Sequence, residues 1–277
     1  MRLCRFGDNR LGLVEQDGMR DVTAALDVIP AHRYPFPPGD MLIGNLEKVT
    51  ARARELATSA PPLPIDAVPL LSPVGNPSKI IGAPMNYRTG QDEAAIAAAL
   101  SIGLFLKANG SLAGASEGIA LRMRERQIDY EVELGVVIGT QASNVTREEA
   151  LKYVGGYAVA LDITPHGKED RSLRKSCETY TVLGPWLVTA DEIPEPGNLD
   201  LQLDVNGERR QQGNTRQMIR DIPGLIEYAS SFYTLYPGDI FLSGTPAGVG
   251  PLKPGDELVA TIEKIGRMRV KVRAMPA

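Results

Sequence analysis

The sequence predicts an α+β protein that is mainly β, with a small α/β domain at the N-terminus, and three patterns support this. Residues 128–139 alternate in polarity and then become wholly apolar, as in a strand that is covered on both faces. Residues 199–213 place an Asn-Gly pair between two alternating segments, which indicates a β-hairpin. From about residue 40 to residue 58, apolar residues recur at helical spacing, which predicts an amphipathic helix.

The proline content suggests the domain organisation. Residues 1–30 have the pattern of short strands and turns, and with the helix over 40–58 they make up the small α/β module. The stretch 59–77 is rich in proline and is expected to be extended. We therefore expect an N-terminal domain over residues 1–72 and a second domain over residues 73–277.

Composition limits the classes of partner and the compartment. The formal net charge of −4 argues against a nucleic acid or an anionic membrane as the main partner. The longest apolar run, residues 94–106, is too short to span a bilayer, and the first ten residues contain no apolar signal core. The two cysteines are too few for a disulfide framework. A cytoplasmic protein is the expectation.

Several elements of the second domain have local signals. One strand carries Lys107 at its polar end, and another, strongly apolar strand ends on Asp162. A helix is expected over residues 222–234, which have a proline in the first turn. Pro-Gly-Asp sequences at 237–239 and 254–256 are interpreted as two turns of one β-sheet.

The predicted strand over 128–139 carries acids at alternate positions. Asp129, Glu131 and Glu133 share one face, because successive side chains of a strand point to opposite faces. Two carboxylates separated by about 6.6 Å repel by roughly 2.5 kcal/mol at an effective dielectric of about 20. A half-buried strand with a solvated acidic face is the simpler alternative. Because no Lys or Arg lies on this face, the pattern also admits a hard divalent cation bound by carboxylate oxygens.

A glycine-rich loop occupies residues 243–251. It lacks the lysine of a P-loop and opens no helix, which argues against nucleotide binding. Its backbone amides and Thr245 suit a carboxylate instead.

Five segments, in this order and spacing, resemble the C-terminal domain of the fumarylacetoacetate hydrolase family: DYEVELGVVIG, GGYAVALDIT, VLGPWLVT, LDVNGERRQQGNTRQMI and YPGDIFLSGTPAGVG. The resemblance covers about residues 79–272, and the N-terminal module is similar to one that many bacterial members carry. It implies a mixed β-sheet roll, a homodimer and Mg²⁺ or Mn²⁺ as the cofactor. It also implies a small-molecule 2-oxo acid or 2-hydroxy-dienoic acid as the substrate, of the kind met in aromatic catabolism.

The resemblance also implies roles for individual residues. Glu131, Glu133 and Asp162 would be the metal ligands, and Lys175 matches the active-site lysine of the family. Thr245 matches a threonine whose loop holds the substrate carboxylate. Lys107 and Lys175 would add positive charge where an oxyanion develops. The residues assigned to substrate binding are Tyr87, Arg88, Lys107, Gly244 and Thr245.

Two positions depart from the family pattern. Family hydrolases often contain NYxxHxxE, whose His and Glu activate water, whereas this chain has NYRTGQDE, with Gly90 and Glu93 at those positions. The family often has an arginine four residues after the aspartate ligand, and this chain has His166 there. We hypothesise that His166 is the acid or base of a modified mechanism, or binds a different substrate group. The alternative is an ordinary surface histidine.

The leading interpretation is a metal-dependent hydrolase that cleaves the C–C bond of an acylpyruvate. Because a glycine cannot accept a proton, a decarboxylase or isomerase is expected almost equally. A non-catalytic relative that binds a metal and an acid is the third possibility. Against it, three clustered carboxylates without a cation would be costly to retain.

Overall fold

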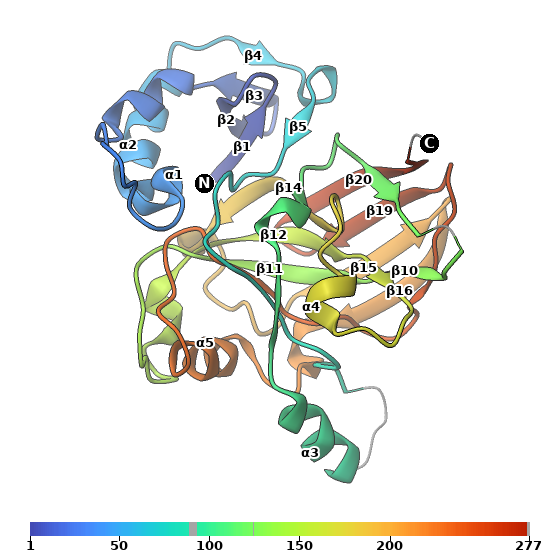
Figure 1. Ribbon diagram of the computed structural model, residues 1–277. Helices are drawn as coiled ribbons and strands as arrows, with labels where there is room; N and C mark the ends of the chain where they lie inside the picture. The colour runs from blue at the N-terminus through green and yellow to red at the C-terminus, as the bar shows by residue number, and fades with distance from the viewer. Residues whose placement is uncertain (89–92, 124, 276–277) are drawn as a thin grey trace.

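The computed structural model describes residues 1–88, 93–123 and 125–275. Its largest sheet has twelve strands and runs from the N-terminal module into the rest of the chain (Figure 1). The path is β4-β3-β2-β1-β14-β12-β11-β17-β6-β7, with β5 on β1 and β8 on β14. The strands are β1 (Arg2–Phe6), β2 (Arg10–Glu15), β3 (Gly18–Asp21), β4 (Pro62–Leu63), β5 (Leu70–Leu71), β6 (Ile80–Gly82), β7 (Phe105–Lys107), β8 (Leu112–Ala113), β11 (Val132–Ile138), β12 (Val154–Asp162), β14 (Thr181–Thr189) and β17 (Ile240–Leu242).

Two smaller sheets complete the β structure. The five-stranded sheet contains β16 (Glu208–Asn214), β15 (Asp200–Val205), β19 (Glu257–Ile262), β20 (Gly266–Ala274) and β9 (Ile119–Leu121), in that order. The three-stranded sheet contains β13 (Thr164–Pro165), β10 (Ile128–Tyr130) and β18 (Gly250–Pro251). The twelve- and five-stranded sheets both mix parallel and antiparallel pairs. This agrees with the mainly β, mixed-sheet fold expected from the sequence.

The helices are short and peripheral. The α-helices are α1 (Met41–Gly44), α2 (Leu46–Ala57), α3 (Glu93–Ile102), α4 (Arg171–Arg174) and α5 (Ile222–Ser230). The 3₁₀ helices are η1 (Thr23–Val28), η2 (Ile65–Ala67), η3 (Asn109–Ser111), η4 (Ala150–Tyr153), η5 (Ala190–Glu192) and η6 (Thr215–Gln217). In the part of the chain that the structure describes, no helix has the length and apolar character that a membrane crossing requires.

The main core lies between the twelve- and five-stranded sheets. Leu134 and Val136 of β11 and Leu161 of β12 pack there with residues of β15, β19 and β20. The opposite face of β11 is also covered, since Val137 packs with Ile43 of α1. All seven residues of β11 are buried, as expected for a strand that is apolar on both faces.

The N-terminal module is continuous with this sheet, because β1 pairs antiparallel with β14, Leu3 opposite Leu187. The helix expected over 40–58 is interrupted at Asn45 and forms α1 and α2. Asp40 caps α1, and its carboxylate accepts from two backbone N–H groups of that helix. The domain boundary after residue 72 stays a prediction.

The expected acidic strand is two strands. β10 belongs to the three-stranded sheet and β11 to the twelve-stranded sheet, so the chain passes between sheets at Glu131. Consequently Asp129 does not join Glu131 and Glu133, and its carboxylate contacts His166 instead. The expectation that the three acids share a face was wrong at Asp129, because the alternation of a strand holds only while the strand is continuous.

Turns and helix starts largely follow their local signals. Asn206 and Gly207 both have positive φ and join β15 to β16, as a two-residue hairpin turn requires. α5 begins at Ile222 as expected, with Asp221 as its cap. The two Pro-Gly-Asp turns, however, precede β17 and β19, which lie in different sheets. Local turn chemistry fixes a turn but does not choose the partner of the strand that follows.

Candidate metal centre and active-site cavity

A cavity of about 360 Å³ opens where β10 gives way to β11 and where β12 ends. The sequence-predicted residues that line it are Tyr87, Glu131, Glu133, Asp162, Lys175, Gly244 and Thr245. They come from segments far apart in the chain, and the sheet pairing brings them together.

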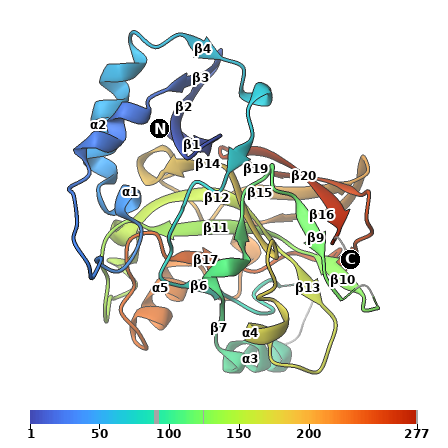
Figure 2. The same cartoon turned by 45° about the horizontal axis from the view of Figure 1, so that its top comes forward.

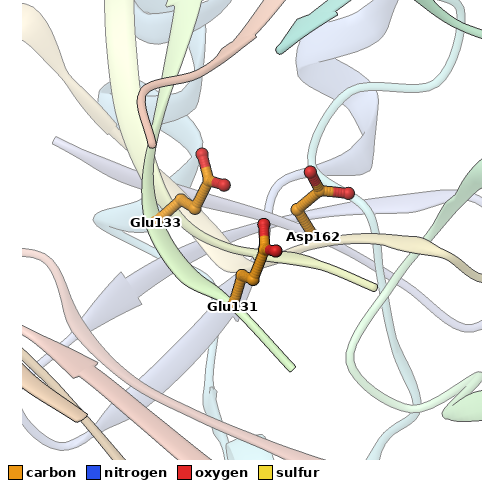
Figure 3. A group of neighbouring side chains, drawn as sticks. All are labelled: Glu131, Glu133 and Asp162. Carbon is orange, nitrogen blue, oxygen red and sulfur yellow. The ribbon is translucent and has the colours of Figure 1, made fainter. Parts of the chain in front are cut away.

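Three carboxylates meet in this cavity (Figure 3). Glu131, Glu133 and Asp162 each offer an oxygen, and these oxygens all lie within 4.8 Å of one another. The pairing of β11 with β12 explains their proximity, since Val132 is opposite Leu161 and the Asp162 N–H donates to the Glu131 carbonyl oxygen at 2.9 Å. The backbone ladder therefore sets the arrangement of the carboxylates.

Two lysines reach the same cluster. Lys175 Nζ lies 2.6 Å from Asp162 Oδ2 and 3.1 Å from Glu131 Oε2. Lys107 Nζ lies 2.5 Å from Asp162 Oδ1 and also donates to the Tyr180 carbonyl oxygen at 2.6 Å. The Lys107 side chain is 0% exposed. Without the family resemblance, a lysine at the end of a strand would be expected in solvent, whereas here it is an interior cation.

Burial and charge shift the pKa values of these groups in different directions. Burial raises the pKa of Glu131, and burial together with Asp162 and Glu131 raises that of Glu133 well above its ordinary value. Burial alone would also raise the pKa of Asp162, but Lys107 and Lys175 outweigh it and hold that pKa low. Burial opposes the charge of Lys175, yet the three carboxylates outweigh it and raise the pKa of that ammonium group.

The donor set suits a hard divalent cation. Three carboxylates face only two ammonium groups, whose ion pairs are with Asp162 and Glu131 and not with Glu133. Gly244 N–H donates to Glu133 Oε2 at 2.6 Å and orients that carboxylate. Oxygen ligands of this kind favour Mg²⁺ or Mn²⁺. These residues therefore fit the group that the sequence implied.

The hydroxyl of Thr245 is held firmly. It donates to the Val132 carbonyl oxygen and accepts from Gln211 Nε2, both at 2.8 Å. Gln211 Oε1 in turn accepts from Val132 N at 2.9 Å. Sequence reasoning missed Gln211, although an uncharged amide at the buried position of a strongly polar hairpin strand was a weak signal.

Other predicted residues lie outside this cavity. Glu93 is exposed at the start of α3, and Arg88 is exposed with its backbone N–H bonded to the Gln217 carbonyl oxygen at 2.8 Å. His166 Nε2 lies 2.7 Å from Asp129 Oδ2 and lines an adjoining cavity of about 200 Å³. Gly90 lies outside the described residues.

Two residues of α4 line the main cavity and were not predicted. They are Arg171 and Arg174, in a loop for which the sequence offered no template. α4 lies against β7, the strand that carries Lys107 (Figure 2). The Asp170 side chain accepts from the Ser172 N–H and starts the helix, so a cap followed by arginines was the available signal.

Comparison with known proteins decides the family. The model of the fumarylacetoacetate (FAA) hydrolase C-terminal domain matches residues 79–273. The chain belongs to the fumarylacetoacetate hydrolase family. The family predicted from the motifs is thus confirmed.

Relatives in the fumarylacetoacetate hydrolase family cover the whole chain. The maleylpyruvate hydrolase of Aquipseudomonas alcaligenes is 50% identical over 287 residues, 99% of this chain and 100% of that protein. The crystal structure of maleylpyruvate hydrolase from Sphingobium sp. SYK-6 in complex with manganese (II) ion and pyruvate is 37% identical, with a TM-score of 0.86 and 99% of both chains covered. The 2-hydroxyhepta-2,4-diene-1,7-dioate isomerase from Mycobacterium marinum is 28% identical, with a TM-score of 0.73 and full coverage of both chains.

These relatives agree with the class expected from the sequence. The chain is a divalent-metal-dependent enzyme of the fumarylacetoacetate hydrolase family, a hydrolase acting on C–C bonds. Its substrate is a small molecule.

Proposed function

We propose that this enzyme hydrolyses the C–C bond between the acyl group and the pyruvate unit of an acylpyruvate, and that maleylpyruvate is its substrate. One observation carries the proposal: the carboxylate oxygens of Glu131, Glu133 and Asp162 lie within 4.8 Å of one another in a cavity that also contains Lys175. The similarity to two maleylpyruvate hydrolases supports the choice of acyl group.

The carboxylates and the two lysines have different proposed roles. Glu131, Glu133 and Asp162 would hold Mg²⁺ or Mn²⁺, and the bound ion would supply Lewis-acid chemistry that favours negative charge on the departing pyruvate unit. Lys175 places an ammonium group beside the same cluster, where that charge develops. Lys107 balances Asp162 from the buried side.

The substrate is oriented by the loop of Gly244 and Thr245. The Gly244 N–H and the Thr245 hydroxyl are engaged with Glu133 and Val132, so this loop is fixed against the strand that carries the ligands. Hydrolysis adds hydroxide to the acyl carbon and a proton to the carbon of the pyruvate unit. Glu93 and His166 stay the predicted proton-transfer groups.

The test is product analysis with maleylpyruvate. The protein loaded with Mn²⁺ should release one pyruvate and one dicarboxylic acid per substrate, and the double variant Glu131→Ala, Glu133→Ala should release neither. Release of CO₂ instead would indicate a decarboxylase. A change of ultraviolet spectrum without cleavage would indicate an isomerase, an outcome that the similarity to the Mycobacterium marinum isomerase makes worth measuring. Binding of oxalate without turnover would indicate a non-catalytic relative.

We also propose that the enzyme works as a homodimer in the cytoplasm, as the family resemblance implies. Light scattering coupled to gel filtration should give twice the chain mass of 29.9 kDa. A monomer mass at micromolar concentration would contradict the dimer.

A further inference from the structure

The cavity holds more positive charge than its metal chemistry requires. Arg171 and Arg174 lie three residues apart on α4, so they share one face of the helix, and both line the cavity that contains the carboxylates. Within the described parts of the chain, neither forms an ion pair within 4.0 Å. By contrast, Arg122 and Arg126, which lie outside this cavity, pair with Glu178 and Glu169.

The charges of the groups in the cavity do not cancel without a further anion. Three carboxylates, two lysines and a divalent cation leave one positive charge, which the carboxylate of a pyruvate unit matches. Arg171 and Arg174 add two further positive charges, of which the adjacent Asp170 carboxylate offsets one, so one positive charge remains for a further anion. Guanidinium groups in a partly enclosed cavity favour an anionic partner, and a carboxylate fits their planar donors.

Arg174 is held close to the proposed metal ligands. Arg174 Nη1 donates to the Pro165 carbonyl oxygen at 2.5 Å, which anchors its guanidinium. Arg174 directly precedes Lys175, whose ammonium group contacts Glu131 and Asp162. Because Arg174 and Lys175 are adjacent in the chain, the position of Arg174 is tied to that of the carboxylate cluster.

His166 does not supply this charge. It stands where the family often has its substrate-binding arginine, but its side chain pairs with Asp129 and is 57% exposed. Arg174 lines both the main cavity and the smaller one beside His166. Arg171 and Arg174 thus line the main cavity, whereas His166 does not.

We propose that Arg171 and Arg174 form a second carboxylate site, which binds the distal carboxylate of the acyl group and makes the enzyme select acylpyruvates that carry one. This inference rests on the proposed function and identifies the residues that recognise the acyl group of the substrate. The pyruvate end binds at the metal, and the distal acid binds at α4.

A binding experiment tests this site without turnover. The probes are 2-oxoglutarate and 2-oxopentanoate, which have the same chain length and differ in the distal carboxylate. Calorimetry on the Mn²⁺-loaded protein should give a dissociation constant at least about 10-fold lower for 2-oxoglutarate. Arg171→Gln, which removes no hydrogen bond described in the structure, should abolish most of this difference. Arg174→Lys should reduce it while keeping a positive charge.

The control is Arg122→Gln, which removes an arginine that pairs with Glu178 outside the cavity. It should leave the preference for 2-oxoglutarate intact. Equal affinity of the wild-type protein for both probes, or equal weakening of both by Arg171→Gln, would overturn the second carboxylate site.

Kinetics separate this inference from the proposed function. The ratio of kcat/KM for maleylpyruvate over acetylpyruvate should fall about 10-fold or more in Arg171→Gln. Cleavage of both substrates by the wild-type enzyme with no preference would overturn the second carboxylate site and leave acylpyruvate hydrolysis standing. Cleavage of neither, together with selective binding of 2-oxoglutarate that depends on Arg171, would overturn the function and support the site.

Discussion

Asp162 lies opposite Glu131 across the β11–β12 pair, and its backbone N–H donates to the Glu131 carbonyl oxygen at 2.9 Å. Two of the proposed metal ligands are therefore joined by a backbone hydrogen bond. Glu131 directly precedes β11 and is half-buried at the cavity, so this hydrogen bond lies at the end of the buried strand pair. The ligand set is preorganised by strand register, and small changes in that register should disturb the site before they unfold the protein.

Replacing Lys107 by Met should destabilise the metal-free protein strongly. The change leaves Asp162, which is 1% exposed, with Lys175 as its remaining cation, and breaking a buried ion pair of this kind costs about 3–5 kcal/mol. Urea unfolding in the presence of a chelator measures the effect. Lys152→Met is the control, since Lys152 pairs with Glu149 in solvent and its loss should change little. Equal midpoints for the two variants would show that Lys107 carries no structural charge.

Replacing Gln211 by Met should loosen the Thr245 loop. The variant leaves the buried Val132 N–H without its acceptor and removes the Gln211 donor from the Thr245 hydroxyl, which keeps its bond to the Val132 carbonyl oxygen, at a cost of about 1–3 kcal/mol. We expect a lower unfolding midpoint and a raised KM for the acylpyruvate. Gln212→Met is the matched control, because Gln212 is exposed on the same strand. If both variants behave alike, the amide of Gln211 does not hold the loop.

Replacing His166 by Ala tests its hypothesised role. If His166 transfers a proton in the reaction, kcat should fall by about 100-fold or more. If it acts only by holding Asp129, His166→Gln should restore much of the activity, because an amide can still donate to that carboxylate. Steady-state kinetics with the same substrate measures both. Full turnover by His166→Ala would eliminate any role in catalysis.

The thiol of Cys4 should be inert in the folded protein. Burial raises the pKa of Cys4 to about 12, so that at pH 8 only about one molecule in 10⁴ carries the reactive thiolate. Burial also raises the pKa of Cys177, but that side chain is only half-buried and should react first. An aromatic disulfide reagent should therefore modify one thiol quickly in the wild-type protein and none quickly in Cys177→Ser. Two fast thiols would mean that the N-terminal module opens readily.

Sequence reasoning predicted what depends on local pattern or on family motifs. The hairpin at Asn206 and the start of α5 have local turn and capping signals. The carboxylate cluster was predicted because Glu131 and Glu133 alternate on a strand and because the motif around Asp162 resembles the family. The structure brings all three together with Lys175.

What escaped prediction depends on contacts between distant segments. Asp129 has the same alternation as Glu131, and only the change of sheet removes it from the cluster. The neutral amide of Gln211 gains its place from a contact between two sheets, because it bonds to Val132 of β11, 79 positions away in the chain. Arg171 and Arg174 lie on α4, whose cap at Asp170 indicates the start of a helix but not that its arginines face the carboxylates.

The continuous pairing of β1 with β14 has a consequence for any shortened form of the protein. β14 also pairs with β12, whose last residue is Asp162. A chain that began at residue 73 would lack β1. The backbone groups of β14 that now pair with β1, at Leu187 and Val188, would then be exposed. Unpaired strand edges attract other strands, so such a fragment should self-associate through an edge one strand away from Asp162, a proposed metal ligand. β1 thus protects the twelve-stranded sheet from pairing with other chains at the edge of β14.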